Sequence, residues 1–234
     1  MTASPTTLTF DVFGTLVDWY GGLSRGLSEV ARRRGWAIDA PALAVEWRRA
    51  FFSGIATVRD GKRAWTDVDT LNGEAVTRLL TAAGVEPEAE DVAVLVSAWR
   101  RLDPWPDTVE GMTRLGEKFT LSALSNGTVA QLTDLARHGG LPFHRIIGSD
   151  LFRAYKPAPQ FYAGALDLLG SGPDSTLMVA SHNYDLLAAA DHGMGTAFVR
   201  RPLEWGGRQT AEEADPKVET ATESLVELAA RLGC

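Results

Sequence analysis

A carboxylate follows the first apolar run of the chain. Residues 8–10 are apolar or β-branched and predict a buried strand, which ends at Asp11 and is followed by the turn residue Gly14. Ligands of open parallel sheets bind at the carboxyl ends of the strands, and a carboxylate there can act as a nucleophile that forms an ester intermediate. The alternative is an Asp that caps a surface turn, because Asp before Gly is common in turns.

Three later strand ends carry polar residues that would meet Asp11 in one crevice. The first of these ends carries Ser125 and Asn126, although a small hydroxyl there is also an ordinary helix N-cap, and both interpretations stay open. The second leads to Lys156, which precedes a proline and therefore favours an extended backbone; the alternative is an exposed loop lysine. The third leads to Asp185.

The charges of these residues suit a nucleophilic carboxylate. Such a group must stay ionised at neutral pH, and a nearby ammonium lowers its pKa. Lys156 is the partner that the sequence offers to Asp11, and at ~4 Å with an effective dielectric of ~20 the attraction is about 4 kcal/mol before desolvation. Two carboxylates and one ammonium can neutralise one another, so charge alone does not require a metal ion. We expect no metal and no cofactor.

The hexapeptide at 11–16, Asp-Val-Phe-Gly-Thr-Leu, resembles the first motif of the haloacid dehalogenase superfamily, and the other three strand ends resemble its later motifs in the same order. Phosphatases of this superfamily place a second Asp two residues after the first, as the general acid. Phe13 stands there in this chain and cannot carry a proton. That departure resembles the L-2-haloacid dehalogenases, in which halide leaves without protonation.

The resemblance implies roles for individual residues. Asp11 would be the nucleophile, Thr15 and Lys156 would assist it, and Asp185 with Asn183 would orient or activate the water that hydrolyses the ester. Contacts to the substrate and the departing halide would come from a second set of side chains and from the backbone: Val12, Phe13, Trp47, Arg48, Ser125, Asn126, Tyr162, His182 and Tyr184. Phe13, Trp47 and Tyr184 would make the pocket apolar, or else are core aromatics.

Two residues of this set have open alternatives. Arg48 follows Trp47 on a predicted helix and could instead extend along the surface with its head in water. His182 stands where many relatives carry Asn or Ser; it could hydrogen-bond the catalytic water or pack as a neutral group. The sequence contains no Gly-rich phosphate loop, no zinc-ligand spacing and no Ser-His-Asp pattern.

The elements that position these residues fall into two parts. From 17 to 102 apolar residues recur at helical spacing, with helices expected at 17–34, from 41, from a Thr66–Asp69 capping box and at 87–102. The stretch 74–83 would be the continuation of the third of these helices or a separate helix. Two prolines at 103–107 mark a linker. Strands then alternate with helices: strands at 119–124, 145–147, 176–180 and 196–199, a short one near Val218, and helices at 107–115, 127–138, 159–169, 185–192 and 222–232.

This alternation predicts an α/β fold with a Rossmann-like parallel sheet covered on both faces. The sheet would be built from residues 1–16 and 107–234. The helical stretch 17–106 would be an insertion, and the resemblance implies that it is a cap over the active site.

Composition narrows the class of partner. The 234 residues are 45% hydrophobic and carry a formal net charge of −7, which disfavours non-specific binding to nucleic acid or anionic membranes. The single cysteine, Cys234, allows no internal disulfide, and no apolar run reaches the roughly 18–20 residues of a membrane span. The segment 1–5 lacks the features of a signal peptide, so a cytoplasmic location is expected. A homodimer is implied by the resemblance only.

The function implied by the resemblance is hydrolytic dehalogenation. Short (S)-2-haloalkanoic acids would become (R)-2-hydroxyalkanoic acids plus halide, through an aspartyl ester on Asp11. The same scaffold could instead be a Mg²⁺-dependent phosphatase that acts on a small phosphomonoester, or a non-catalytic binding protein. The sequence does not rank the haloacids or the halogens.

Overall fold

Six parallel strands form the centre of the molecule. The computed structural model describes residues 4–234, and the strands lie in the order β3-β2-β1-β4-β5-β6. The strands are β1 Thr7–Phe10, β2 Thr120–Ser125, β3 Arg145–Gly148, β4 Thr176–Ala180, β5 Gly195–Val199 and β6 Thr220–Thr222. The predicted parallel α/β sheet is confirmed, with β1 between β2 and β4.

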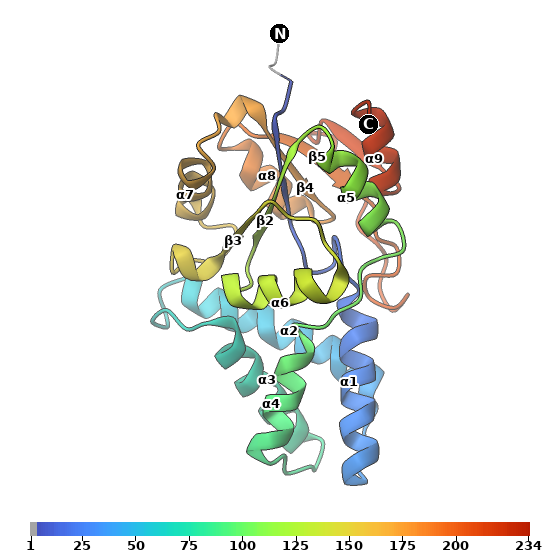
Figure 1. The fold of residues 1–234 in the computed structure, drawn as a ribbon. Coiled ribbons are helices and arrows are strands. Elements are labelled where there is room, and N and C mark those ends of the chain that lie inside the picture. Colours follow the sequence, from blue (N-terminus) through green and yellow to red (C-terminus); the bar gives the residue numbers. More distant parts are fainter. Residues whose placement is uncertain (1–3) are drawn as a thin grey trace.

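Helices cover the sheet and form a separate layer beyond the carboxyl ends of its strands (Figure 1). The helices are α1 Trp19–Arg34, α2 Ala40–Arg59, α3 Val68–Ala82, α4 Ala89–Ala98, α5 Thr108–Gly116, α6 Val129–Gly139, α7 Pro159–Leu169, α8 Asn183–Ala190 and α9 Leu225–Arg231, with short 3₁₀ turns η1 Ser149–Leu151 and η2 Pro173–Ser175. In Figure 1, β1 runs from the N-terminus down toward the layer of α1–α4.

Both faces of the sheet are buried, as a parallel sheet requires. Along β4, Leu177 and Val179 belong to one apolar cluster, whereas Met178 and Ala180 belong to another. Helices α5, α6 and α9 contribute to the first cluster and α7 and α8 to the second. Since each fully buried Leu, Val or Met side chain stabilises the fold by about 1.5–3 kcal/mol, these clusters fix the strands and hence the positions of their ends.

Local signals set most helix ends where the sequence predicts them. Helix α1 ends at Gly35, which has a positive φ of 70° and donates its backbone N–H to Ala31. The predicted capping box at the third helix is wrong: Asp67, not Thr66, is the N-cap of α3, because its carboxylate accepts from the backbone N–H groups of Asp69 and Thr70. The helix then continues unbroken through 74–82.

Other boundaries differ by a few residues. Helix α4 is shorter than 87–102, and α8 begins at Asn183, two residues before Asp185. The last strand, β6, lies two residues beyond Val218. Because β6 pairs with β5 through Thr222, α9 cannot begin there and starts after the capping Ser224.

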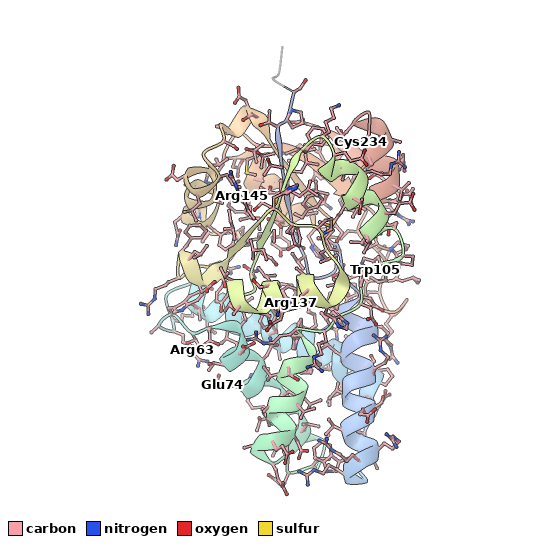
Figure 2. The ribbon with its side chains drawn as sticks, in the orientation of Figure 1. Arg63, Glu74, Trp105, Arg137, Arg145 and Cys234 are labelled. Carbon is pink, nitrogen blue, oxygen red and sulfur yellow. The ribbon has the colours of Figure 1, made fainter. Side chains whose placement is uncertain are left out.

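The segment 17–106, described in full, holds four helices and no strand; isolated bridges join Val17 to Phe13 and to Pro104. Trp105, labelled in Figure 2, lies in the linker and donates its indole N–H to the carbonyl of Gly14 at 2.8 Å. The division into a core of 1–16 and 107–234 and a cap of 17–106 stays a prediction.

Two further expectations concern the chain ends and membranes. The expectation for the segment 1–5 falls partly on residues 1–3, outside the described residues. Within residues 4–234, no helix combines the length and the apolar character needed to cross a bilayer. The cytoplasmic location and the homodimer stay predictions.

Candidate active site

Asp11 is the first residue after β1 and is 6% exposed. Its backbone N–H donates to Val179 of β4 at 3.0 Å, which extends the strand pairing up to the carboxylate. The chain then turns sharply through Gly14, whose φ is +97°, a conformation that suits glycine. Thr15 therefore lies back over Asp11, and its hydroxyl donates to Oδ2 of that carboxylate at 2.9 Å.

Lys156 lies between two carboxylates in the interior. Its Nζ is 2.6 Å from Oδ2 of Asp185 and 3.4 Å from Oδ1 of Asp11. Its backbone N–H donates to the side-chain oxygen of Asn126 at 2.8 Å, so the end of β2 holds the lysine in place. On the other side of Asp185, the Tyr162 hydroxyl donates to Oδ1 at 2.7 Å. This arrangement places a cation where the two acids would otherwise repel each other.

The environments of the two carboxylates push their pKa values apart. Burial alone would raise the pKa of Asp11, but Lys156, His182 and Thr15 outweigh it and hold that pKa well below its ordinary value. Burial and the charge of Asp11 raise the pKa of Asp185 in spite of Lys156 and Tyr162. Asp11 is therefore the carboxylate that stays ionised, and Asp185 is the more basic of the two.

His182 joins Asp11 to a second buried acid. Its Nδ1 is 3.2 Å from Oδ2 of Asp11, and its Nε2 is 3.0 and 3.1 Å from the two oxygens of Glu204. Burial would lower the pKa of His182, but Glu204 and Asp11 raise it well above 6.5. With a carboxylate facing each ring nitrogen, this geometry favours an imidazolium that donates from both nitrogens.

Glu204 is a site residue that the sequence analysis missed. It is 6% exposed, and the indole N–H of Trp19 donates to its Oε1 at 3.0 Å. A Cβ on Gly14 would be 2.3 Å from that same oxygen, so only glycine fits there. Burial would raise the pKa of Glu204, but His182 and Arg48 lower it.

Arg48 reaches the same region from α2. It is 3% exposed, and one guanidinium nitrogen donates to the carbonyl of Phe13 at 3.1 Å. The guanidinium carbon is 4.4 Å from the ring centre of Phe52 and 5.3 Å from that of Trp19. Within residues 4–234 its Nε has no hydrogen-bond partner, and burial lowers the pKa of Arg48. The alternative of a surface arginine is wrong: this is a buried cation with donor capacity to spare.

The remaining predicted residues differ in their surroundings. Ser125 is fully buried, and over the described part of the chain its Oγ has no hydrogen-bond partner. Phe13 packs edge-on against Trp99 with ring centres 5.6 Å apart. Trp47 also packs on Trp99, and its indole N–H donates to the carbonyl of Asn72 at 3.0 Å, inside the helical layer. Tyr184 is 39% exposed.

Hydrogen bonds bring part of the predicted set together. The residues joined in one network are Asp11, Thr15, Asn126, Lys156, Tyr162, His182 and Asp185. Val12 is buried, and its carbonyl accepts from Leu16 and Val17.

Asn183 is not brought to this network. Its amide donates to Glu212 and to the carbonyl of Glu213, each at 2.9 Å, and its oxygen accepts from the backbone of Asp215 at 2.8 Å. Asn183 thus fastens the segment 212–215 to α8.

A metal ion would have to compete with Lys156 between Asp11 and Asp185. Across residues 4–234, no three His, Cys, Asp or Glu side chains are grouped to hold a metal ion. The expectation of a metal-independent site stays a prediction.

Comparisons with known proteins point to one family. Residues 5–193 match the model of the haloacid dehalogenase-like hydrolases. A defluorinating L-2-haloacid dehalogenase of known structure is 35% identical, covers 98% of this chain and 96% of its own, and superposes with a TM-score of 0.95. A second L-2-haloacid dehalogenase structure is 37% identical, with coverages of 98% and 99% and a TM-score of 0.94. The (S)-2-haloacid dehalogenase of Xanthobacter autotrophicus is 29% identical over 83% of this chain and 74% of its own.

Proposed function

The chain belongs to the haloacid dehalogenase-like hydrolase family, and we propose that it hydrolyses short (S)-2-haloalkanoic acids to (R)-2-hydroxyalkanoic acids and halide. The observation that carries the proposal is Phe13, a buried ring two residues after the nucleophile, where phosphatases of the family keep their general acid. A halide leaves as a stable anion and needs no proton, so a benzyl side chain suits that position. The relatives named as L-2-haloacid dehalogenases support the same reading.

In the first step a carboxylate oxygen of Asp11 attacks the carbon that bears the halogen, from the side opposite the leaving group. A C–O bond forms, the carbon–halogen bond breaks, and the halide leaves with the electron pair, which inverts the carbon. Arg48 and Asn126 would stabilise the halide. The Ser125 hydroxyl, which has no hydrogen-bond partner among residues 4–234, and the backbone N–H groups after Asp11 would bind the substrate carboxylate.

In the second step water attacks the carboxyl carbon of the Asp11 ester. Asp185 orients this water and takes a proton from it, because its raised pKa makes it the better base, while Tyr162 and Lys156 fix its position. The water oxygen stays on Asp11, and the original carboxylate oxygen leaves with the product. One proton ends on the product hydroxyl and the other is released.

The test is halide release from (S)- and (R)-2-chloropropionate, each measured with and without EDTA. We expect chloride from the (S) enantiomer only, at a rate that EDTA does not change. Mg²⁺-stimulated hydrolysis of a phosphomonoester without chloride release would instead identify a phosphatase. Single-turnover hydrolysis in ¹⁸O-water should place the label in Asp11, whereas label directly in the product would rule out the ester.

A further inference from the structure

We propose that the two oxygens of Asp11 have different tasks: Oδ1 is the attacking atom, and Oδ2 lies in an oxyanion hole formed by Thr15 and by His182, which Glu204 anchors. This inference rests on the proposed function, because it divides the labour within its two steps. It gives His182 a catalytic role as a charged donor to the ester carbonyl.

The hydrogen bonds of Asp11 distinguish its two oxygens. Oδ2 accepts from the Thr15 hydroxyl at 2.9 Å and lies 3.2 Å from Nδ1 of His182. Oδ1 has Nζ of Lys156 at 3.4 Å, and that ammonium is bound more closely to Asp185, at 2.6 Å. Hydrogen bonds reduce the nucleophilicity of an oxygen, so Oδ1 is the freer of the two to attack carbon.

Thr15 is fixed as a donor by its own surroundings. The backbone N–H of Ser181 donates to Thr15 Oγ1 at 3.0 Å, and the Ser181 hydroxyl is also 3.0 Å from it. With its acceptor side occupied, the Thr15 hydroxyl directs its hydrogen to Asp11. Chains of this kind polarise the last donor and strengthen it.

Glu204 keeps the His182 ring both oriented and charged. The groups that face the ring are Asp11 on one side, Glu204 on the other and the ring of Tyr184, 5.8 Å away between centres. The charge of Arg48 interacts with Glu204, and the charges of Lys156 and Asp185 interact with Asp11. Once Asp11 becomes a neutral ester, Glu204 is the carboxylate that still holds the proton on the ring.

In the second step, the negative charge then develops on Oδ2, where Thr15 and His182 already lie as donors. Water attacks Cγ, the electron pair of the carbonyl bond moves onto Oδ2, and one water proton passes to Asp185. The intermediate collapses as Cγ–Oδ1 breaks, and Oδ1 leaves as the product hydroxyl with the proton from Asp185. The second water proton leaves Asp11 for the solvent, which restores the carboxylate. Thr15 and the His182 imidazolium donate to Oδ2 while it bears the charge.

The experiment separates the two steps in the full-length protein with (S)-2-chloropropionate. In His182→Ala, the first chloride should appear in a burst of about one per site, at a rate within about tenfold of wild type. Steady turnover should fall by about 10²–10³-fold, the usual effect of losing one oxyanion donor. Intact-protein mass spectrometry should show the ester accumulating on Asp11. The matched control is His138→Ala, which removes an exposed histidine 3.3 Å from Asp103 and should turn over like wild type.

Glu204→Gln provides a second, nearly isosteric test. The amide holds the ring but not its charge, so ester hydrolysis should slow as the pH rises through neutrality, whereas wild type should stay level over that range. A slower burst without accumulated ester in His182→Ala, or a Glu204→Gln profile that matches wild type, would overturn the inference. If wild type releases no halide, the proposed function itself fails.

Discussion

The ammonium of Lys156 lies between two buried carboxylates at unequal distances. It lies closer to Asp185 than to Asp11, yet the pKa of Asp11 is the one that is depressed, because Asp11 also accepts from Thr15 and His182. Under the proposed function, this asymmetry would give two identical functional groups two chemistries, Asp11 as the nucleophile and Asp185 as the base.

Removal of that charge should cost both stability and activity. Lys156→Met would leave two carboxylates buried without their ammonium, and the free energy of unfolding should fall by about 3–5 kcal/mol. Urea denaturation and halide release measure the two effects. Lys62→Met is the control, since the Lys62 side chain is 74% exposed and its ammonium lies 3.7 Å from Asp60, and the substitution should change neither stability nor activity. Unchanged stability in Lys156→Met would show that the buried pair is not charged.

The charge of His182 predicts how stability depends on pH. Its pKa is raised in the folded protein, so its contribution is complete below the ordinary histidine value of about 6.5 and is lost as the pH rises through the raised pKa. The difference in unfolding free energy between wild type and His182→Asn should therefore be level in mild acid and shrink toward alkaline pH. Urea titrations over that range measure it, and a difference that grows with pH would contradict the protonated ring.

The sequence predicted the residues that stand at strand ends but not their partner Glu204. Asp11 and Ser125 stand at the ends of β1 and β2, and Lys156 and Asp185 lie in the segments that follow β3 and β4, so their order along the chain can be read from the sequence. Glu204 lies 22 residues after His182 in a loop, with no periodicity or motif around it, and only the packing of the chain brings the two together.

At the scale of elements, the turn from β1 into α1 positions several residues of the candidate site. It places Asp11, Phe13 and Thr15 within five residues, and it is closed by a glycine at positive φ against Glu204. The Asp–x–x–Gly spacing predicted the turn. It could not predict the buried acid that excludes any side chain from Gly14.

Gly14→Ala tests that contact. The substitution combines an unfavourable positive φ with a Cβ 2.3 Å from Oε1 of Glu204, so Glu204 must move away from His182. We expect the unfolding free energy to fall by about 2–4 kcal/mol, of which roughly 1–2 kcal/mol is backbone strain. Gly61→Ala is the matched control: its φ is +69° and no atom of the described residues lies within 4 Å of the added Cβ, so only the backbone cost applies. Equal losses in the two variants, measured in urea, would show that Glu204 is not held there.

The predicted boundaries of helices and strands were wrong where two local sequence signals competed. Thr66 and Asp67 are both N-cap residues, and the one whose carboxylate reaches two backbone N–H groups became the cap of α3. Thr222 suits either a strand or a helix start, and pairing with Val199 decided for the strand. Such choices depend on neighbours far away in the sequence, so only the existence and type of these elements were predictable.

At the scale of the whole molecule, the site balances its own charges although the chain carries a formal net charge of −7. Asp11, Asp185 and Glu204 face Lys156, His182 and Arg48 in the buried region. Asp11, Lys156, His182 and Glu204 come from loops that follow the strands, and Asp185 comes from the first turn of α8, whereas Arg48 comes from α2 in the helical layer. Under the proposed function, an anionic substrate would meet a cation from the helical layer, opposite Asp11, and substrate binding would depend on the contact between the two layers.

Arg48→Met should separate function from stability. Because the Arg48 side chain is buried, its charged guanidinium is disfavoured, and an apolar side chain of similar length should leave the unfolding free energy within about 1 kcal/mol of wild type or above it. Halide release should nevertheless fall by about 10³-fold or more, because the substrate and the halide would lose their cation. Arg49→Met is the matched control on the next residue, which is half exposed and paired with Glu46; both its stability and its activity should match wild type. Activity retained in Arg48→Met together with a large loss of stability would make Arg48 a structural bridge between the layers instead of an anion-binding residue.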